Sequence, residues 1–146
     1  LDTIIADAQR KREEVCFAMI DVDKFKAVND TYGHPIGDRV LIALARLIRQ
    51  RVRKADIVGR FGGEEFAVIL PGCSITAAAS LLNEVRESFA AVIFQAKEDT
   101  FSCTFSCGIA PLSLYGDSTA LNAGADEALY AAKNGGRNLV VSAGGR

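Results

Sequence analysis

The sequence predicts an α/β protein of the α+β type, in which helices flank a central mixed, mainly antiparallel sheet. Helical and strand-like patterns follow one another without regular strand–helix–strand alternation. A glycine pair separates two strand-like runs in the middle of the chain, which is typical of a β-hairpin. No linker, repeat or low-complexity stretch divides the sequence, so we expect a single domain over residues 1–146.

Hydrophobic periodicity and capping residues place the individual elements. Apolar residues at helical spacing predict helices at residues 2–14, 38–53, 75–94 and 118–136. Short apolar or alternating runs predict strands at residues 16–23, 57–61, 65–70, 100–110 and 138–142. Asp23 is expected to cap a further short helix, and the turn-like TYGHPIGD (31–38) ends at Asp38, which opens the next helix. Phe101, Cys103 and Phe105 are expected to share one face of their strand.

The composition narrows the classes of function. The net charge is −1, from 17 basic and 18 acidic residues, so the sequence predicts no broad basic surface for nucleic acid. It contains neither an apolar run long enough to span a membrane nor a signal-peptide pattern. The four cysteines form no CxxC pair and are expected to be reduced, buried thiols of a cytoplasmic protein. Because the chain does not start with Met, we expect it to be a piece of a longer protein.

Acidic residues are predicted to gather where two strands meet. Asp21 ends an apolar strand, and Glu64 and Glu65 follow the Gly62-Gly63 turn of the hairpin. If the two strands are neighbours, Asp21 and a glutamate come together, and Mg²⁺ would relieve their repulsion. Successive strand residues point to opposite faces, so both glutamates reach such a site only if the turn interrupts the alternation. The alternative is a plain hairpin with solvated glutamates.

Four segments occur in a characteristic order: DVDKFKAVNDTYGHPIGD, RKADIVGRFGGEEF, SCGIA and ADEALYAAKNGGRN. Together they closely resemble the GGDEF family of diguanylate cyclases, from about residue 16 to residue 141, with the signature present as GGEEF. The resemblance implies a palm-like nucleotidyl cyclase fold. It also implies an enzyme that condenses two GTP molecules into cyclic di-GMP and two pyrophosphates.

The resemblance implies the following site residues. Two Mg²⁺ ions, or Mn²⁺, would be held in each half-site by Asp21, the carbonyl of Val22, Glu64 and Glu65. Glu64 would also activate the ribose 3′-hydroxyl, and Lys26 would stabilise charge in the transition state. The groups around GTP would be Phe25, Lys26, Asn29, His34, Asp38, Gly62, Gly63, Lys133 and Arg137.

Within this set, Asn29 and Asp38 match guanine-binding residues, and Lys133 and Arg137 match residues that grip the phosphates. Each residue also has an ordinary structural interpretation. Asn29 and Asp38 fit helix caps, His34 fits a turn, and Lys133 fits a helix C-terminus.

The segment RVRKAD suggests control by the product. Arg53 and Asp56 form an RxxD motif five residues before Gly62, which matches the inhibitory product site of the family. A second arginine would come from elsewhere, and Arg86 is a candidate. A basic helix end is the alternative interpretation.

The resemblance further implies a symmetric homodimer, because each domain would hold one GTP and therefore half of an active site. It places the domain in the bacterial cytoplasm, with membrane attachment only through other parts of a longer protein. The family's opening signature, D-x-L-T-G-L-x-N-R, and any sensor domain are missing from the sequence. Two alternatives remain: a module that binds cyclic di-GMP or GTP without catalysis, and a cyclase that uses another nucleotide.

Overall fold

The computed structural model describes residues 1–144 and confirms the predicted fold class. The helices are α1 (Asp2–Lys11), α2 (Phe25–Tyr32), α3 (His34–Arg51), α4 (Ile75–Ala90), α5 (Leu112–Tyr115) and α6 (Ser118–Asn134). The strands are β1 (Val15–Val22), β2 (Ile57–Arg60), β3 (Glu65–Pro71), β4 (Phe94–Ala96), β5 (Asp99–Phe101), β6 (Phe105–Pro111) and β7 (Val140–Ser142). The main sheet has the order β2-β3-β1-β6-β7, and within it only β6 and β7 run parallel in the described chain.

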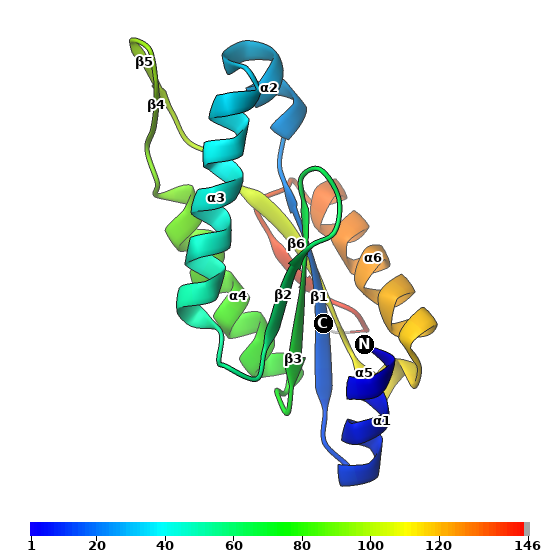
Figure 1. Cartoon of the computed structure of the whole chain (residues 1–146). Helices are drawn as coiled ribbons and strands as arrows, with labels where there is room; N and C mark the ends of the chain where they lie inside the picture. The colour runs from blue at the N-terminus through cyan, green and yellow to red at the C-terminus, as the bar shows by residue number, and fades with distance from the viewer. Residues whose placement is uncertain (145–146) are drawn as a thin grey trace.

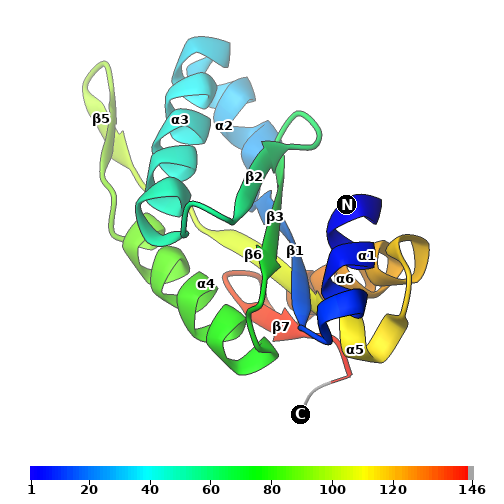
Figure 2. The ribbon, with the colours of Figure 1, turned by 60° about the horizontal axis from the view of Figure 1, so that its bottom comes forward.

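The sheet lies between two layers of helices, with α3 and α4 on one face and α1 and α6 on the other (Figures 1 and 2). The central strand β1 is buried along its whole length because both of its faces are covered. Its alternate residues divide between two apolar clusters: Ala18 and Ile20 pack with α3 and α4, whereas Phe17 and Met19 pack with α1 and α6. Asp21 continues the series of Phe17 and Met19, so its position in the strand places it on the α6 face.

The close packing of α6 against the sheet depends on Gly108 in β6. A Cβ atom at this position would overlap the backbone nitrogen of Leu129 and the carbonyl oxygen of Ala125. Only glycine therefore allows the α6 backbone to lie this close to the sheet. This close packing also fixes the end of α6, where Lys133 lies.

The region between α4 and β6 differs from the prediction. The expected helix at 75–94 ends at Ala90, and the expected strand at 100–110 is divided into β5 and β6 by residues 102–104. A second hairpin, β4–β5, forms here and projects beyond the sheet beside α2 and α3 (Figure 1). The aromatic rings explain the difference: Phe101 stacks on Tyr32 of α2 at 4.4 Å and on Phe94 at 5.4 Å, which ties the hairpin to its neighbours.

The start of α3 also differs from the prediction. Between α2 and α3 the helical conformation is interrupted only at Gly33, which has φ 90. Helix α3 then begins at His34, with Pro35 in its first turn. Asp38 therefore lies inside the helix and does not open it. Asp23 is not the cap of α2 either, because Lys24 holds the N-cap position and the Asp23 carboxylate bonds elsewhere.

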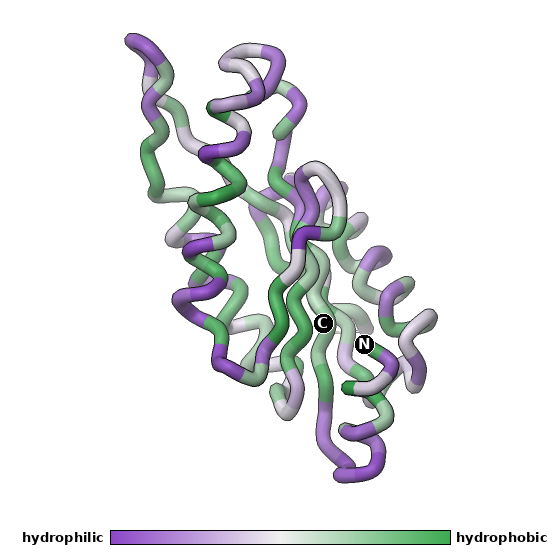
Figure 3. The backbone as a smooth tube through the Cα atoms, in the orientation of Figure 1, coloured by the Kyte–Doolittle hydropathy of each residue, from purple (hydrophilic) through white to green (hydrophobic). Residues whose placement is uncertain are grey.

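Polar and apolar segments separate clearly along the chain (Figure 3). The strands of the sheet are largely apolar, whereas the tip of the β4–β5 hairpin is hydrophilic. Within residues 1–144, no helix combines the length and the apolar character that crossing a bilayer requires.

Candidate active site

Asp21 and Glu65 face each other across the β1–β3 pair. The antiparallel register aligns their Cα atoms directly, and directly opposed residues point to the same face of a sheet. The two carboxylates are therefore neighbours at the end of the sheet that carries the Gly-Gly hairpin. This register confirms the predicted contact between the Asp21 strand and the hairpin strand.

Glu64 lies in the bend of the hairpin and not in β3, which begins at Glu65. The N–H of Phe61 donates to the carbonyl of Glu65 at 2.8 Å, which leaves residues 62–64 as the loop. The expected two-residue Gly-Gly turn is thus a longer loop, and the alternation of strand side chains does not constrain Glu64. The Val22 N–H donates to the Glu64 carbonyl at 3.3 Å, so the loop still lies against the end of β1.

The two glycines of the loop have different surroundings. A Cβ atom at Gly62 would lie 3.0 Å from Glu65 Oε1, whereas one at Gly63 would have no atom within 4 Å among the described residues. Neither glycine has a φ in the left-handed region. The guanidinium of Arg60 donates to the Gly63 carbonyl at 2.7 Å and ties the loop to the end of β2. The fold of residues 1–144 therefore does not require glycine at position 63.

The Asp21 carboxylate is buried and only partly satisfied. Its Oδ2 pairs with the ammonium of Lys133 at the end of α6, and its Oδ1 has no hydrogen-bond partner among residues 1–144. Such an orphaned carboxylate oxygen is costly unless a ligand completes it. The described residues bring no three acidic, histidine or cysteine side chains into a ready-made metal cluster. Even so, Asp21, Glu65 and the nearby Glu64 offer hard oxygen ligands, so the donor set fits Mg²⁺.

Glu64 belongs electrostatically to the same cluster. Burial raises the pKa of its carboxyl above the usual range, and the charges of Asp21 and Glu65 raise this pKa further, while Lys133 opposes them. Carboxylates that crowd together in this way resist simultaneous ionisation. A cation between them would reverse the effect.

Asn29 marks a second unsatisfied position, between α2 and α3. Its Oδ1 is buried without a hydrogen-bond partner in the described part of the chain. A Cβ atom at Gly37 would overlap this oxygen and lie 3.1 Å from Cζ of Phe25. Sequence reasoning placed Gly37 in a turn and missed this role, although Gly37 in fact lies inside α3, where glycine is unfavourable unless space requires it. Gly37 provides the space that Asn29 and Phe25 occupy.

The remaining predicted nucleotide residues lie on open surface near this end of the sheet. Arg137 follows α6 and lines a hollow of about 430 Å³ together with Asp23, Lys24 and Asn138. The exposed members of the set are Lys26, His34, Asp38, Gly62, Gly63 and Arg137.

Arg53 and Asp56 contact each other at the far end of α3. The Arg53 guanidinium donates to both oxygens of Asp56, at 2.7 and 3.2 Å, and also to the carbonyl of Pro71. Asp56 Oδ2 additionally accepts from the Arg53 backbone N–H at 2.7 Å. The pair borders a hollow of about 340 Å³ that Arg49 and Lys54 also line, so this surface is basic.

Arg86, the candidate second arginine of that surface, is engaged elsewhere. Its guanidinium donates to Asn83 Oδ1 at 2.8 Å and to Asn138 Oδ1 at 2.9 Å. Asn138 belongs to the loop after α6, and Arg53 has other partners. Arg86 is thus not among the described residues that line the hollow beside Arg53 and Asp56.

The cysteines are free thiols, and Cys16, Cys103 and Cys107 are buried as predicted, whereas Cys73 is only half-buried. Burial raises the pKa of Cys16 to about 12 and that of Cys103 to about 11. These thiols stay protonated and belong to the core.

Known proteins share this sequence pattern and this fold. A family model described as diguanylate cyclase, GGDEF domain, matches residues 1–139. Diguanylate cyclase DgcP of Pseudomonas aeruginosa is 41% identical over 140 residues, which cover 96% of this chain. The matched residues are 21% of DgcP, so the chain spans about a fifth of the length of this curated relative.

Solved structures agree in both fold and sequence. The GGDEF domain of DgcB from Caulobacter crescentus, in complex with c-di-GMP, has a TM-score of 0.95 at 34% identity, covering 99% of this chain and 86% of that one. The active GGEEF domain of a diguanylate cyclase from Vibrio cholerae has a TM-score of 0.92 at 33% identity, covering 99% and 92%. This likeness places the chain among the palm-like nucleotidyl cyclase domains. Within that class, the chain belongs to the GGDEF domain family of diguanylate cyclases.

Proposed function

We propose that this chain is a catalytic domain that condenses two GTP molecules into cyclic di-GMP and two pyrophosphates. The observation that carries the proposal is the buried Asp21 carboxylate, which has one unpartnered oxygen and lies directly opposite Glu65 at the Gly-Gly hairpin. Two Mg²⁺ ions, or Mn²⁺, would be held by Asp21, Glu64, Glu65 and the carbonyl of Val22. Bound there, the metal lowers the pKa of the attacking hydroxyl and neutralises charge on the phosphates.

In the proposed reaction, the 3′-hydroxyl of each GTP attacks the α-phosphate of the other and displaces pyrophosphate. Glu64 accepts the hydroxyl proton, and Lys26 stabilises the charge that develops on the phosphate. Lys133, which pairs with Asp21 in the chain alone, is close enough to the site to turn its ammonium toward the phosphates of GTP. Phe25, Gly62 and Gly63 position the triphosphate.

Guanine selection is assigned to Asn29 and Asp38. The Asn29 amide accepts and donates, and the Asp38 carboxylate accepts from the N–H groups on the guanine edge. His34 lies at the start of α3 and faces the same nucleotide. Replacing GTP by ATP in competition experiments tests this assignment, because adenine presents a different pattern of donors and acceptors.

A symmetric dimer is part of the proposal. Most of the nucleotide residues of one chain are exposed. In the proposal they bind one GTP, and the second GTP would come from a partner chain around a two-fold axis. Turnover by the purified chain is therefore expected to rise more steeply than linearly with protein concentration. We place the domain in the bacterial cytoplasm, where its substrate GTP is found.

Product inhibition is proposed to act through Arg53 and Asp56. The basic hollow beside them suits an anionic dinucleotide, with the guanidinium binding phosphate or guanine and the carboxylate accepting guanine N–H groups. Binding requires Asp56 to exchange its bonds with Arg53 for bonds with the product.

The direct test is to incubate the purified chain with GTP and Mg²⁺ at increasing protein concentration and to measure cyclic di-GMP. Glu64→Ala should abolish turnover and keep product binding, and Arg53→Ala should keep turnover and relieve inhibition. Absence of cyclic di-GMP from both the chain and a longer protein that contains it would refute the proposal. Full inhibition of Arg53→Ala would refute the inhibitory site alone.

A further inference from the structure

Asp23 is a buried carboxylate that the proposed reaction does not use. Its Oδ1 accepts from the Ser106 hydroxyl at 2.6 Å, and its Oδ2 accepts from the Thr104 hydroxyl at 2.7 Å. Oδ2 also accepts from the backbone N–H of Asn138 at 3.0 Å. Both oxygens are thus bonded to groups that lie 81 to 115 residues away along the sequence.

The loop after α6 needs such a bond because its backbone is strained. Gly136, Arg137 and Asn138 have consecutive φ values of 115, 64 and 50. Arginine and asparagine in the left-handed region carry a conformational penalty, so they persist there only where neighbouring groups hold them. Asp23 holds the backbone of Asn138, and the Arg86 guanidinium holds its side chain at 2.9 Å.

The residue directly before Asn138 is Arg137, which lines the same hollow as Asp23. The left-handed conformation of residues 137 and 138 decides the direction in which the Arg137 side chain leaves the loop. The hydrogen bond from the Asn138 N–H to Asp23 therefore also sets the orientation of Arg137. A neutral apolar contact would not fix a single N–H direction in this way.

We propose that Asp23 is a positioning residue: through Asn138 it holds Arg137 in the orientation that binds the phosphates of GTP. Arg86 is the outer anchor of the same loop, which gives this arginine a role away from the inhibitory surface. The inference rests on the proposed function, because it takes from it the role of Arg137 at the phosphates.

The readout is the ratio of the Kd for GMP to the Kd for GTP, measured by calorimetry on the purified chain. This ratio isolates the contribution of the outer phosphates. Asp23→Ala removes the hydrogen bond to Asn138. It should weaken GTP binding about tenfold with little change for GMP, so the ratio should fall about tenfold. A general loosening of the fold would weaken both nucleotides and leave the ratio unchanged.

Matched variants separate positioning from stability. Asp23→Asn keeps a carbonyl oxygen for the Asn138 N–H and should restore the ratio. Ser106→Ala removes one bond to the same carboxylate but leaves the bond to the loop, so it should preserve the ratio. In an Arg137→Ala background, Asp23→Ala should have no further effect on GTP binding, because both changes remove the same contribution.

Several outcomes would overturn the inference. An unchanged ratio in Asp23→Ala would do so, as would additive effects of Asp23→Ala and Arg137→Ala. If Arg137→Ala itself leaves GTP binding intact while cyclic di-GMP still forms, the inference fails and the proposed reaction stands. If Asp23→Ala does not fold, Arg86→Ala tests the outer anchor instead, and an unchanged ratio there would count against the inference.

Discussion

The end of β1 presents two aspartates, two residues apart, with opposite surroundings. Asp21 and Asp23 are both almost buried, at 6% and 9% exposure. Asp23 accepts three hydrogen bonds, whereas Asp21 has one oxygen on Lys133 and one that is unpartnered among residues 1–144. Since native folds satisfy nearly all buried polar groups, the exception indicates where a ligand binds. In the proposed function, the satisfied carboxylate of Asp23 holds the fold together, and the unsatisfied carboxylate of Asp21 binds metal.

The most severe way to test this contrast is Asp21→Asn. The amide replaces a hard anionic ligand, so we expect turnover to fall by roughly a thousandfold, equivalent to several kcal/mol of lost metal contribution. The melting temperature should change little, because the loss of the ion pair with Lys133 is offset by the relief of repulsion between Asp21 and Glu64. Asp126→Asn, at an exposed position of α6, is the control and should keep full activity. Full activity of Asp21→Asn would show that the Asp21 carboxylate is not needed for the reaction.

How far the site could be predicted depends on the range of the contacts. The mainly antiparallel sheet, the hairpin and the approach of Asp21 to one of the glutamates were predictable, because hydrophobic alternation and a Gly-Gly pair mark strands and turns locally. The unsatisfied Asp21 was also foreseeable from its place at the end of an apolar strand. The pairing of β1 with β3, which makes Glu65 the partner of Asp21, was an assumption at that point and comes from the structure.

The errors have the opposite character. Asp23 was predicted as a cap, because aspartate before a short helix usually bonds locally, but its partners Thr104, Ser106 and Asn138 come from distant segments. No local pattern records such contacts. In the same way, the apolar alternation across residues 100–110 concealed the break at 102–104, which aromatic stacking between separate elements produces.

Gly37→Ala extends the comparison to Asn29, the other residue with an unpartnered buried oxygen in the described chain. The new methyl group would overlap Asn29 Oδ1 and press on the Phe25 ring. We expect the free energy of unfolding to fall by about 1–3 kcal/mol and GTP affinity to fall with it. Denaturant titration and calorimetry measure the two quantities. Unchanged GTP affinity would show that the position of Asn29 does not matter for guanine.

Gly63→Ala separates fold from ligand more cleanly. A Cβ atom there meets nothing within 4 Å among residues 1–144, so stability should change by no more than about 0.5 kcal/mol. GTP binding should still weaken about tenfold, if phosphates approach this backbone closely. Gly59→Ala is the matched control, since Gly59 lies in β2 with equally open surroundings and should leave both quantities unchanged. Normal GTP binding by Gly63→Ala would show that the phosphates do not approach the backbone at this position.

The smallest expected effect concerns the charge on Glu64, and it follows from the sign of the pKa shift. Burial, followed by the charge of Asp21, raises the pKa of Glu64 in the folded chain above its ordinary value of 4.5. The folded state therefore binds the proton more tightly than the unfolded state, and stability falls as pH rises through the folded pKa.

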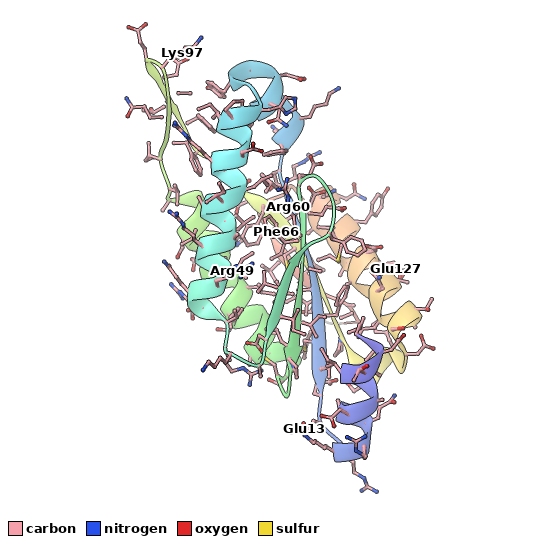
Figure 4. All side chains as sticks on the ribbon, in the orientation of Figure 1. Glu13, Arg49, Arg60, Phe66, Lys97 and Glu127 are labelled. Atoms are coloured by element: carbon pink, nitrogen blue, oxygen red, sulfur yellow. The ribbon has the colours of Figure 1, made fainter. Side chains whose placement is uncertain are left out.

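Glu64→Gln removes this penalty, so its melting temperature should exceed that of the wild type slightly at neutral pH and match it below pH 4.5. Thermal melts at both pH values, without nucleotide or metal, measure the difference. Glu127→Gln, whose side chain points outward from α6 (Figure 4), should show no such gap. Because Glu64→Gln should at the same time lose turnover, the variant would show that the site keeps its carboxylates together against the preference of the fold. A variant that is less stable than the wild type at neutral pH would contradict this account.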